Sequence, residues 1–93
     1  MPLFAMIGRD GPGGLELRAK HRPAHIERLD SIAAAGGISH AGPLLDEEGK
    51  PVGSLILFKA DDLTDARAFA SEDPYVIEGV FATHEVHETK MVF

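Results

Sequence analysis

The order of the apolar segments along this chain restricts its fold more than any other feature. The periodicities predict strands at residues 2–8, 38–45, 52–60 and 79–93, and helices at 15–35 and over about ten residues of 61–73. Two helices between four strands must cover one face of an antiparallel sheet, with right-handed crossovers joining parallel neighbours. The order therefore predicts an α+β, ferredoxin-like βαββαβ fold.

The first predicted helix contains a proline. Apolar residues such as Leu17, Ile26 and Leu29 recur at helical spacing, and the glycines at 36 and 37 supply a stop. Pro23 lacks a backbone N–H and disfavours helical geometry at Arg22. We therefore expect a short turn ahead of a main helix that begins near Pro23.

Length and composition limit the classes of function. Ninety-three residues fit one domain, residues 1–93, and 44% hydrophobic with 26% charged residues is typical of a globular protein. The formal net charge of -6 repels phosphate backbones, so we expect no nucleic-acid partner. The absence of cysteine excludes disulfides and thiolate nucleophiles and suits a reducing interior. No apolar run approaches a membrane span, so a cytoplasmic location without membrane contact is expected.

The predicted sheet would leave one face uncovered by helices. Such a face carries Leu, Ile and Phe side chains, and a short chain buries only about 60–68% of the surface of its unfolded form. A second copy of the chain is the simplest cover. We therefore predict a homodimer packed sheet against sheet.

His25 begins the apolar stripe of the first predicted helix. It lies four residues before Leu29 and seven before Ile32, so the imidazole faces the sheet and is partly buried. A lone histidine in that position is either a hydrogen-bonded core residue or a proton carrier. Arg22 lies one turn earlier on the same side, and a half-buried guanidinium needs an anionic partner, either a protein carboxylate or a ligand.

A metal site is a weaker interpretation of the same histidine. His21 and His25 have the i, i+4 spacing that can hold a transition metal on a helix, but Pro23 disturbs the turn and no third ligand is evident. The other three histidines (His40, His84 and His87) scatter over predicted strands. We therefore expect no metal and no other cofactor.

The stretch "EDPYVIEG" at 72–79 carries a second candidate group. Asp73 before a proline either shapes a chain reversal, with Tyr75 packing beside it, or reaches back to orient a histidine on the first helix. Ser54 lies in a glycine-punctuated strand segment that favours close approach near a cleft. Since no nucleophile motif surrounds Ser54, it is a candidate hydrogen-bonding group only.

Five short motifs together resemble the YCII-related (YciI-like) family. They are "RPAHIERL" at 22–29, "AGPL" at 41–44, "GS" at 53–54, "DPYVIEGV" at 73–80 and the closing "VF", and they span nearly the whole chain. The resemblance implies the dimeric α+β barrel form of the ferredoxin-like fold. It also implies that His25 and Asp73 match the family's paired histidine and aspartate, proposed to form an active site in a cleft beside the sheet.

These residues together suggest a small cofactor-independent enzyme of lyase or isomerase type. His25 would move a proton on a small organic, anionic substrate while Asp73 fixes its tautomer. Arg22, Ser54 and Tyr75 would bind the substrate. The alternative is a non-catalytic small-molecule-binding or structural dimeric domain in which the histidine and aspartate form a structural pair. Relatives that share this barrel include isomerases, lyases and monooxygenases, so the fold does not specify the reaction.

Overall fold

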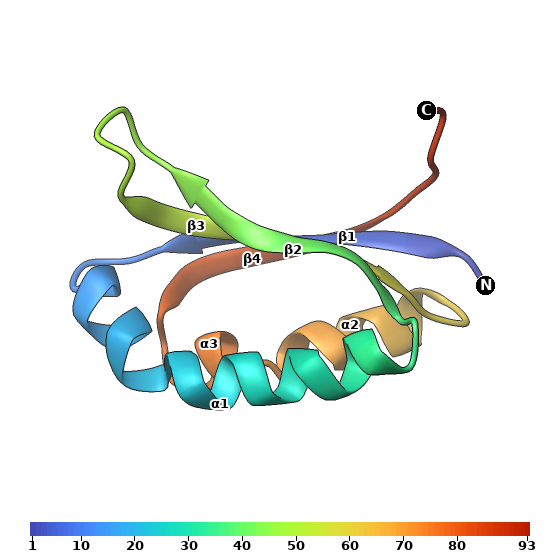
Figure 1. The fold of residues 1–93 in the computed structure, drawn as a ribbon, viewed down its shortest axis with the longest axis horizontal. Coiled ribbons are helices and arrows are strands. Elements are labelled where there is room, and N and C mark those ends of the chain that lie inside the picture. Colours follow the sequence, from blue (N-terminus) through green and yellow to red (C-terminus); the bar gives the residue numbers. More distant parts are fainter.

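A four-stranded antiparallel sheet forms one layer of the protein, and helices cover one of its faces (Figure 1). The computed structural model describes the whole chain, residues 1–93. The strands are β1 (Leu3–Asp10), β2 (Ile38–Leu45), β3 (Pro51–Lys59) and β4 (Phe81–Thr89), and the helices are α1 (Gly14–Ala34), α2 (Leu63–Ser71) and α3 (Pro74–Ile77). The sheet order is β2-β3-β1-β4, with every neighbouring pair antiparallel. The predicted ferredoxin-like α+β fold is confirmed.

The core lies between the sheet and the helices. Alternate residues of the two central strands point into it, and Phe4 of β1 is the cross-strand partner of Phe58 of β3, with ring centroids 6.1 Å apart. Phe69 of α2 stacks on Phe58 at a centroid distance of 3.9 Å. Because apolar burial is the main stabilising term in folding, this cluster fixes α2 against the sheet.

The opposite face of the sheet has no covering element in the single chain (Figure 1). Its centre is formed by half-buried aliphatic side chains of β1 and β3: Leu3, Ala5, Ile7, Leu55 and Leu57. Its edges carry polar residues that include His40, Glu85 and His87. We call this surface the open face. An apolar centre with a polar rim is the composition of a protein–protein interface.

Helix α1 is continuous from Gly14 to Ala34, so the predicted turn ahead of Pro23 is wrong. Pro23 cannot donate to the Ala19 carbonyl, and its ring crowds that carbonyl. Figure 1 shows the helix changing direction in its N-terminal half instead of ending there. Packing of the remaining turns against the sheet outweighs the local cost of the proline.

The predicted glycine stop at the end of α1 is confirmed, since Gly36 has φ 79° and the Gly37 N–H donates to the Ile32 carbonyl.

Other boundaries differ from prediction by a few residues. β1 continues two residues beyond its expected end, to Asp10, because the Arg9–Asp10 segment still pairs with β4. Residues 74–77 form the short helix α3 where only a turn was predicted, and β4 ends at Thr89. The β2–β3 hairpin and α2, capped by the Asp62 carboxylate, match expectation within a residue or two. None of the helices combines the length and apolar character that a bilayer crossing requires.

Gly8 of β1 allows a close packing contact that supports the site described below. A Cβ atom at position 8 would lie 2.5–2.6 Å from three atoms of the Phe81 ring. We expect Gly8→Ala to lower the free energy of unfolding by about 1–3 kcal/mol, because the ring must move. The measurement is chemical denaturation followed by circular dichroism.

Gly42→Ala, in β2 of the same sheet, is the matched control. Its added Cβ would meet nothing nearer than the His40 ring at 3.5 Å, an ordinary contact. Equal losses of stability in the two variants would contradict the packing explanation.

Candidate functional site

One face of α1 carries the polar groups that point toward the sheet. Arg18, His25 and Leu29 are buried, with 7–8% of each residue exposed. Arg22 lies between them in the same 4-3-4 spacing but remains exposed. The helical period therefore directs two cations and an imidazole into one region between α1 and the sheet.

Asp73 meets His25 across 48 positions of sequence. Its carboxylate is completely buried at the junction of α2 and α3, where Oδ1 accepts hydrogen bonds from the Tyr75 backbone N–H at 2.8 Å and from His25 Nδ1 at 2.9 Å. Both interpretations of Asp73 therefore hold geometrically, since it caps α3 and also contacts the imidazole. An ionised carboxylate can only accept, and opposite such a group the hydrogen of a neutral imidazole belongs on Nδ1, which leaves Nε2 for a molecule in the cavity.

Tyr75 fixes the plane of the imidazole. Its ring stacks on the His25 ring with centroids 3.9 Å apart and an interplanar angle of 6°. The Phe81 ring lies perpendicular to the Tyr75 ring with centroids 5.7 Å apart, and the Tyr75 hydroxyl donates to the Arg18 backbone carbonyl at 3.4 Å. His25 is thus held by a hydrogen bond at its edge and by an aromatic ring against its face.

Arg18 and Asp10 form a second buried pair, which the sequence analysis missed. Arg18 Nε and Nη2 donate to the two oxygens of Asp10 at 2.6 and 2.9 Å, and Nη2 also donates to Ser54 Oγ at 2.9 Å. The position of Arg18, four residues before Arg22 and seven before His25, was a usable signal. Asp10 gave none, because "RDGPGG" reads as a loop.

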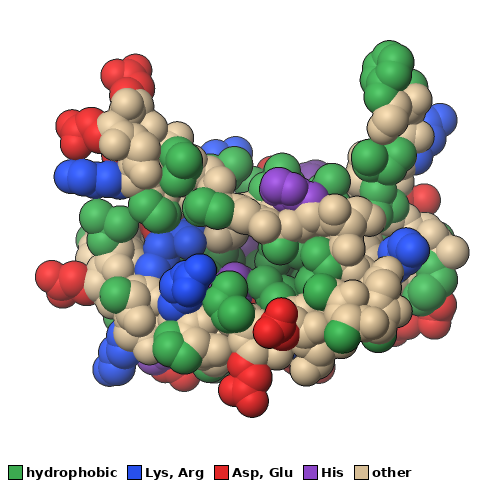
Figure 2. All heavy atoms as spheres, viewed as in Figure 1, with side chains coloured by type: hydrophobic (Ala, Val, Ile, Leu, Met, Phe, Trp, Pro, Cys, Tyr) green, Lys and Arg blue, Asp and Glu red, His purple; other side chains and the backbone are tan.

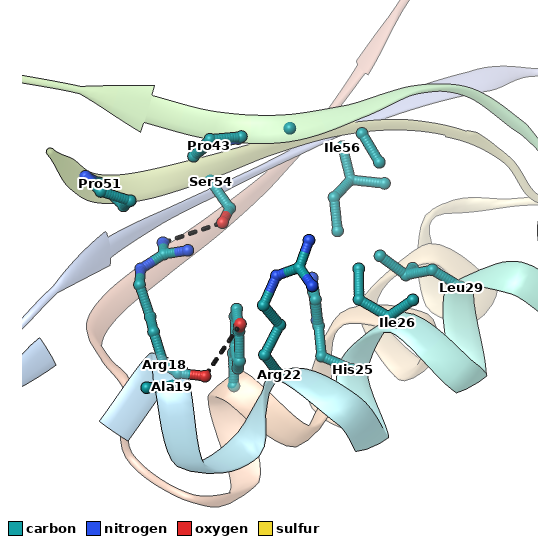
Figure 3. Close-up of a pocket in the computed structure, with 13 residues that line it drawn as sticks. Arg18, Ala19, Arg22, His25, Ile26, Leu29, Pro43, Pro51, Ser54 and Ile56 are labelled. Carbon is teal, nitrogen blue, oxygen red and sulfur yellow. Dashed lines mark hydrogen bonds between the residues drawn. The ribbon is translucent and has the colours of Figure 1, made fainter. Parts of the chain in front are cut away.

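A cavity of about 240 Å³ opens between α1 and the β2–β3 half of the sheet (Figure 3). Its polar lining is Arg18, Arg22, His25, Ser54 and Tyr75; its other lining residues are Ala19, Ile26, Leu29, Ala41, Gly42, Pro43, Pro51 and Ile56. Figure 2 shows this face of the molecule hollowed, with Lys or Arg side chains beside the opening. Four of the five predicted site residues therefore line one cavity, and the fifth, Asp73, lies behind His25.

The two cavity arginines differ in their charge balance. Arg18 is neutralised by the bidentate contact with Asp10. Arg22 forms no ion pair or hydrogen bond with another side chain. The cavity consequently contains one guanidinium whose charge is not matched by the protein.

The structure does not bring the other histidines into this site. His21 Nε2 lies 3.7 Å from a carboxylate oxygen of Glu78, and His40, His84 and His87 are exposed on β2 and β4. No group of three or more His, Asp or Glu side chains is arranged to hold a metal ion. The i, i+4 pair on α1 therefore has no third ligand.

Burial raises the pKa of the Tyr75 phenol above its ordinary value of 10.0. The guanidiniums of Arg18 and Arg22 oppose this rise, whereas the carboxylates of Asp73 and Asp10 add to it. Tyr75 therefore remains a neutral hydrogen-bond donor throughout the physiological range.

Comparison with known proteins decides the family. Residues 2–90 match the family model of the YCII-related domain. The chain belongs to the YCII-related family. It is 32% identical to protein YciI of Escherichia coli O6:H1 over 97 residues, covering 98% of this chain and 99% of that protein. It is also 32% identical over 96 residues to an uncharacterized protein of Haemophilus influenzae, covering 97% and 98% of the two chains.

One solved structure similar to this YCII-related chain is that of an enzyme with a named reaction. The 5-chloro-2-hydroxyhydroquinone dehydrochlorinase of Burkholderia phenoliruptrix, in complex with 2,5-dihydroxybenzoquinone, superposes with a TM-score of 0.83 at 28% identity, covering 95% of this chain and 93% of that one. An antibiotic biosynthesis monooxygenase superposes with a TM-score of 0.58 at 8% identity, covering 99% of both chains, and shares the fold alone. The similarity to the dehydrochlorinase supports catalysis on a small molecule as a broad class of function in this family.

Tyr75 provides a direct test of the buried environment, because it is the only tyrosine and the chain has no tryptophan. We expect the near-ultraviolet phenolate absorbance to rise with a midpoint above 10.0 in the folded protein, and at about 10 in denaturant. The fold retains the phenol proton more tightly than the unfolded chain does. Its contribution to stability is therefore complete below about pH 10 and is lost as the pH rises through the folded pKa.

Tyr75→Phe should remove the alkaline absorbance change and the part of the pH-dependent stability that belongs to this group. A folded-state midpoint at or below that of the denatured chain would contradict the buried phenol.

Proposed function

We propose that this YCII-related domain is a cofactor-independent enzyme of lyase or isomerase type that moves a proton on a small anionic organic molecule. The observation that carries the proposal is the buried His25–Asp73 hydrogen bond beside a cavity that also contains the unmatched charge of Arg22. A proton acceptor and an anion-binding group thereby face the same space.

His25 would act as the general base. An unperturbed imidazole is mostly neutral at physiological pH. It can therefore take a proton at Nε2 while its Nδ1–H stays hydrogen-bonded to a carboxylate. Asp73 would hold that tautomer and stabilise the imidazolium that forms. The proton would then return to another atom of the substrate or pass to a leaving group, which gives isomerisation or elimination.

The substrate would be held by its charge and by its apolar body. Arg22 would donate paired hydrogen bonds to a carboxylate or enolate oxygen. Ser54 Oγ already accepts from Arg18, so its O–H is left to donate, and the neutral Tyr75 stacks behind the base. Ile26, Leu29 and Ile56 form an apolar wall that suits a ring or a short aliphatic chain.

The dehydrochlorinase supports this assignment. Removal of hydrogen chloride includes a proton transfer from the substrate, which is the chemistry proposed for His25. Its bound dihydroxybenzoquinone is also a small, planar, acidic ring. We extend only this class of reaction and ligand to the present chain.

The complete burial of Asp73 and its capping of α3 favour one competing role, a structural His25–Asp73 pair in a non-catalytic binding domain. The two roles differ in what a change at His25 does. A structural pair mainly sets stability, whereas a base sets turnover.

His25→Ala should reduce turnover by about 10²–10⁴-fold while the protein stays folded, because general-base catalysis contributes about that factor. The assay incubates the protein with hydroxyquinones, chlorinated hydroquinones and enolisable carboxylates in D₂O. Deuterium incorporation and chloride release are followed by NMR and ion chromatography.

His21→Ala is the matched control, one turn earlier on α1 and outside the cavity lining. It should retain turnover. Unchanged turnover in His25→Ala, or a lowered melting temperature as its only effect, would support the structural pair and refute the enzyme.

We also propose that the protein acts in the cytoplasm as a homodimer in which the open faces of two copies pack together. The half-buried aliphatic residues of β1 and β3 would form the centre of the interface, and the polar edges would form its rim. A second copy would also extend a core that a chain of this length keeps small.

Leu57→Lys should convert the dimer to a folded monomer, because it places a charge in the centre of the open face. Sedimentation velocity at micromolar concentration measures the mass, and circular dichroism checks the fold. Ile77→Lys, on the exposed surface of α3, is the control and should remain dimeric. A monomeric wild-type protein would contradict the proposed interface.

A further inference from the structure

Two buried polar atoms in the protein lack a hydrogen-bond partner, and they face each other. They are Nη1 of Arg28 and Oδ2 of Asp73, and the distance between them is 3.6 Å. Buried charged atoms are rarely left without partners, because the loss of hydration is unfavourable unless an opposite charge offsets it. The pair is therefore held together by charge at a distance slightly longer than a direct hydrogen bond.

Arg28 is fixed from the side of α2. Its Nη2 donates to the Phe69 backbone carbonyl at 2.7 Å, and its guanidinium lies 4.6 Å from the centre of the Phe69 ring. The Glu72 carboxylate, 3.8 Å from Nη2, is exposed and screened by solvent. These contacts hold the remaining Nη1 toward Asp73.

Arg28 also lies outside the cavity. The cavity lining contains Arg18, Arg22, Tyr75 and His25 but not Arg28, which contacts Asp73 through the oxygen that His25 does not use. The order in space is therefore guanidinium, carboxylate, imidazole and cavity. No molecule in the cavity needs to touch Arg28 for this residue to affect the imidazole.

We propose that Arg28 is a positioning residue that sets the tautomer of His25 through Asp73. By holding Oδ2, Arg28 prevents rotation of the carboxylate, so Oδ1 stays aimed at His25 Nδ1. The imidazole then carries its hydrogen on Nδ1 and presents Nε2 to the cavity. The importance of this role for catalysis rests on the proposed function, in which His25 is the general base.

The alternative is that Arg28 only joins α1 to α2 through Phe69. That role would affect stability but not the position of the imidazole hydrogen. The two roles therefore separate on a measurement of the His25 ring nitrogens.

The test is ¹⁵N NMR of the imidazole nitrogens at about pH 9, where an ordinary histidine is neutral. In the wild-type protein, His25 should show a protonated Nδ1 and an unprotonated Nε2. In Arg28→Met the preference for this tautomer should fall about fivefold or more, because a stabilised hydrogen-bond geometry is lost. Arg28→Lys keeps the charge but not the planar fork, so it should restore part of the preference.

Two controls separate the contact with Asp73 from general charge effects. Arg67→Met removes an exposed arginine from α2, and Glu72→Gln removes the outer carboxylate beside Arg28. Both should leave the His25 nitrogen shifts unchanged. In an Asp73→Asn background, Arg28→Met should cause no further change, because the route through the carboxylate is already absent.

Unchanged His25 nitrogen shifts in Arg28→Met, with or without a lower melting temperature, would overturn the proposal. A further tautomer change in the Asp73→Asn background would overturn it as well. If Arg28→Met does not fold, Arg28→Lys decides, and wild-type shifts in that variant count against the role. The readout needs no substrate, so it stands or falls independently of the turnover assay for His25.

Discussion

The burial of one carboxylate organises the site. Asp73 is removed completely from water, and such a group is tolerated only where hydrogen bonds and opposite charge replace its hydration. The Tyr75 N–H, His25 and Arg28 supply them from α3 and α1. The carboxylate therefore requires α1 to lie against the α2–α3 junction, and this contact places the imidazole at the cavity.

Two arginine–carboxylate pairs flank the imidazole, and they differ in function. Arg18 and Asp10 join the start of α1 to the end of β1 by a bidentate contact, so this pair adds no net charge to the cavity. Arg28 faces Asp73 from the other side. With both guanidiniums balanced, Arg22 alone supplies an unmatched positive charge. The proposed preference for an anionic substrate therefore rests on the arrangement of charges in the cavity and not on the net charge of the chain, which is negative.

Much of the fold and most of the site residues could be predicted from the sequence, whereas the Arg18–Asp10 pair could not. Strand and helix periods predict the topology, and the stripe of His25 and Leu29 predicts which face of α1 is inside. The continuity of α1 through Pro23 was not predictable in this way, because tertiary packing overrides a local cost. Asp10 could not be found either, since its partner depends on how a glycine-rich loop folds the chain back onto α1.

The fold and the site carry different information about function. A monooxygenase at 8% identity shares the two-layer architecture, so the architecture alone cannot specify a proton transfer. The fold supplies a cavity of about 240 Å³ between α1 and the β2–β3 half of the sheet. The chemistry depends on which side chains of α1 point into that cavity. Here they are an imidazole hydrogen-bonded to a buried carboxylate and an unpaired guanidinium, and this combination is what the proposed proton transfer on a small anion rests on.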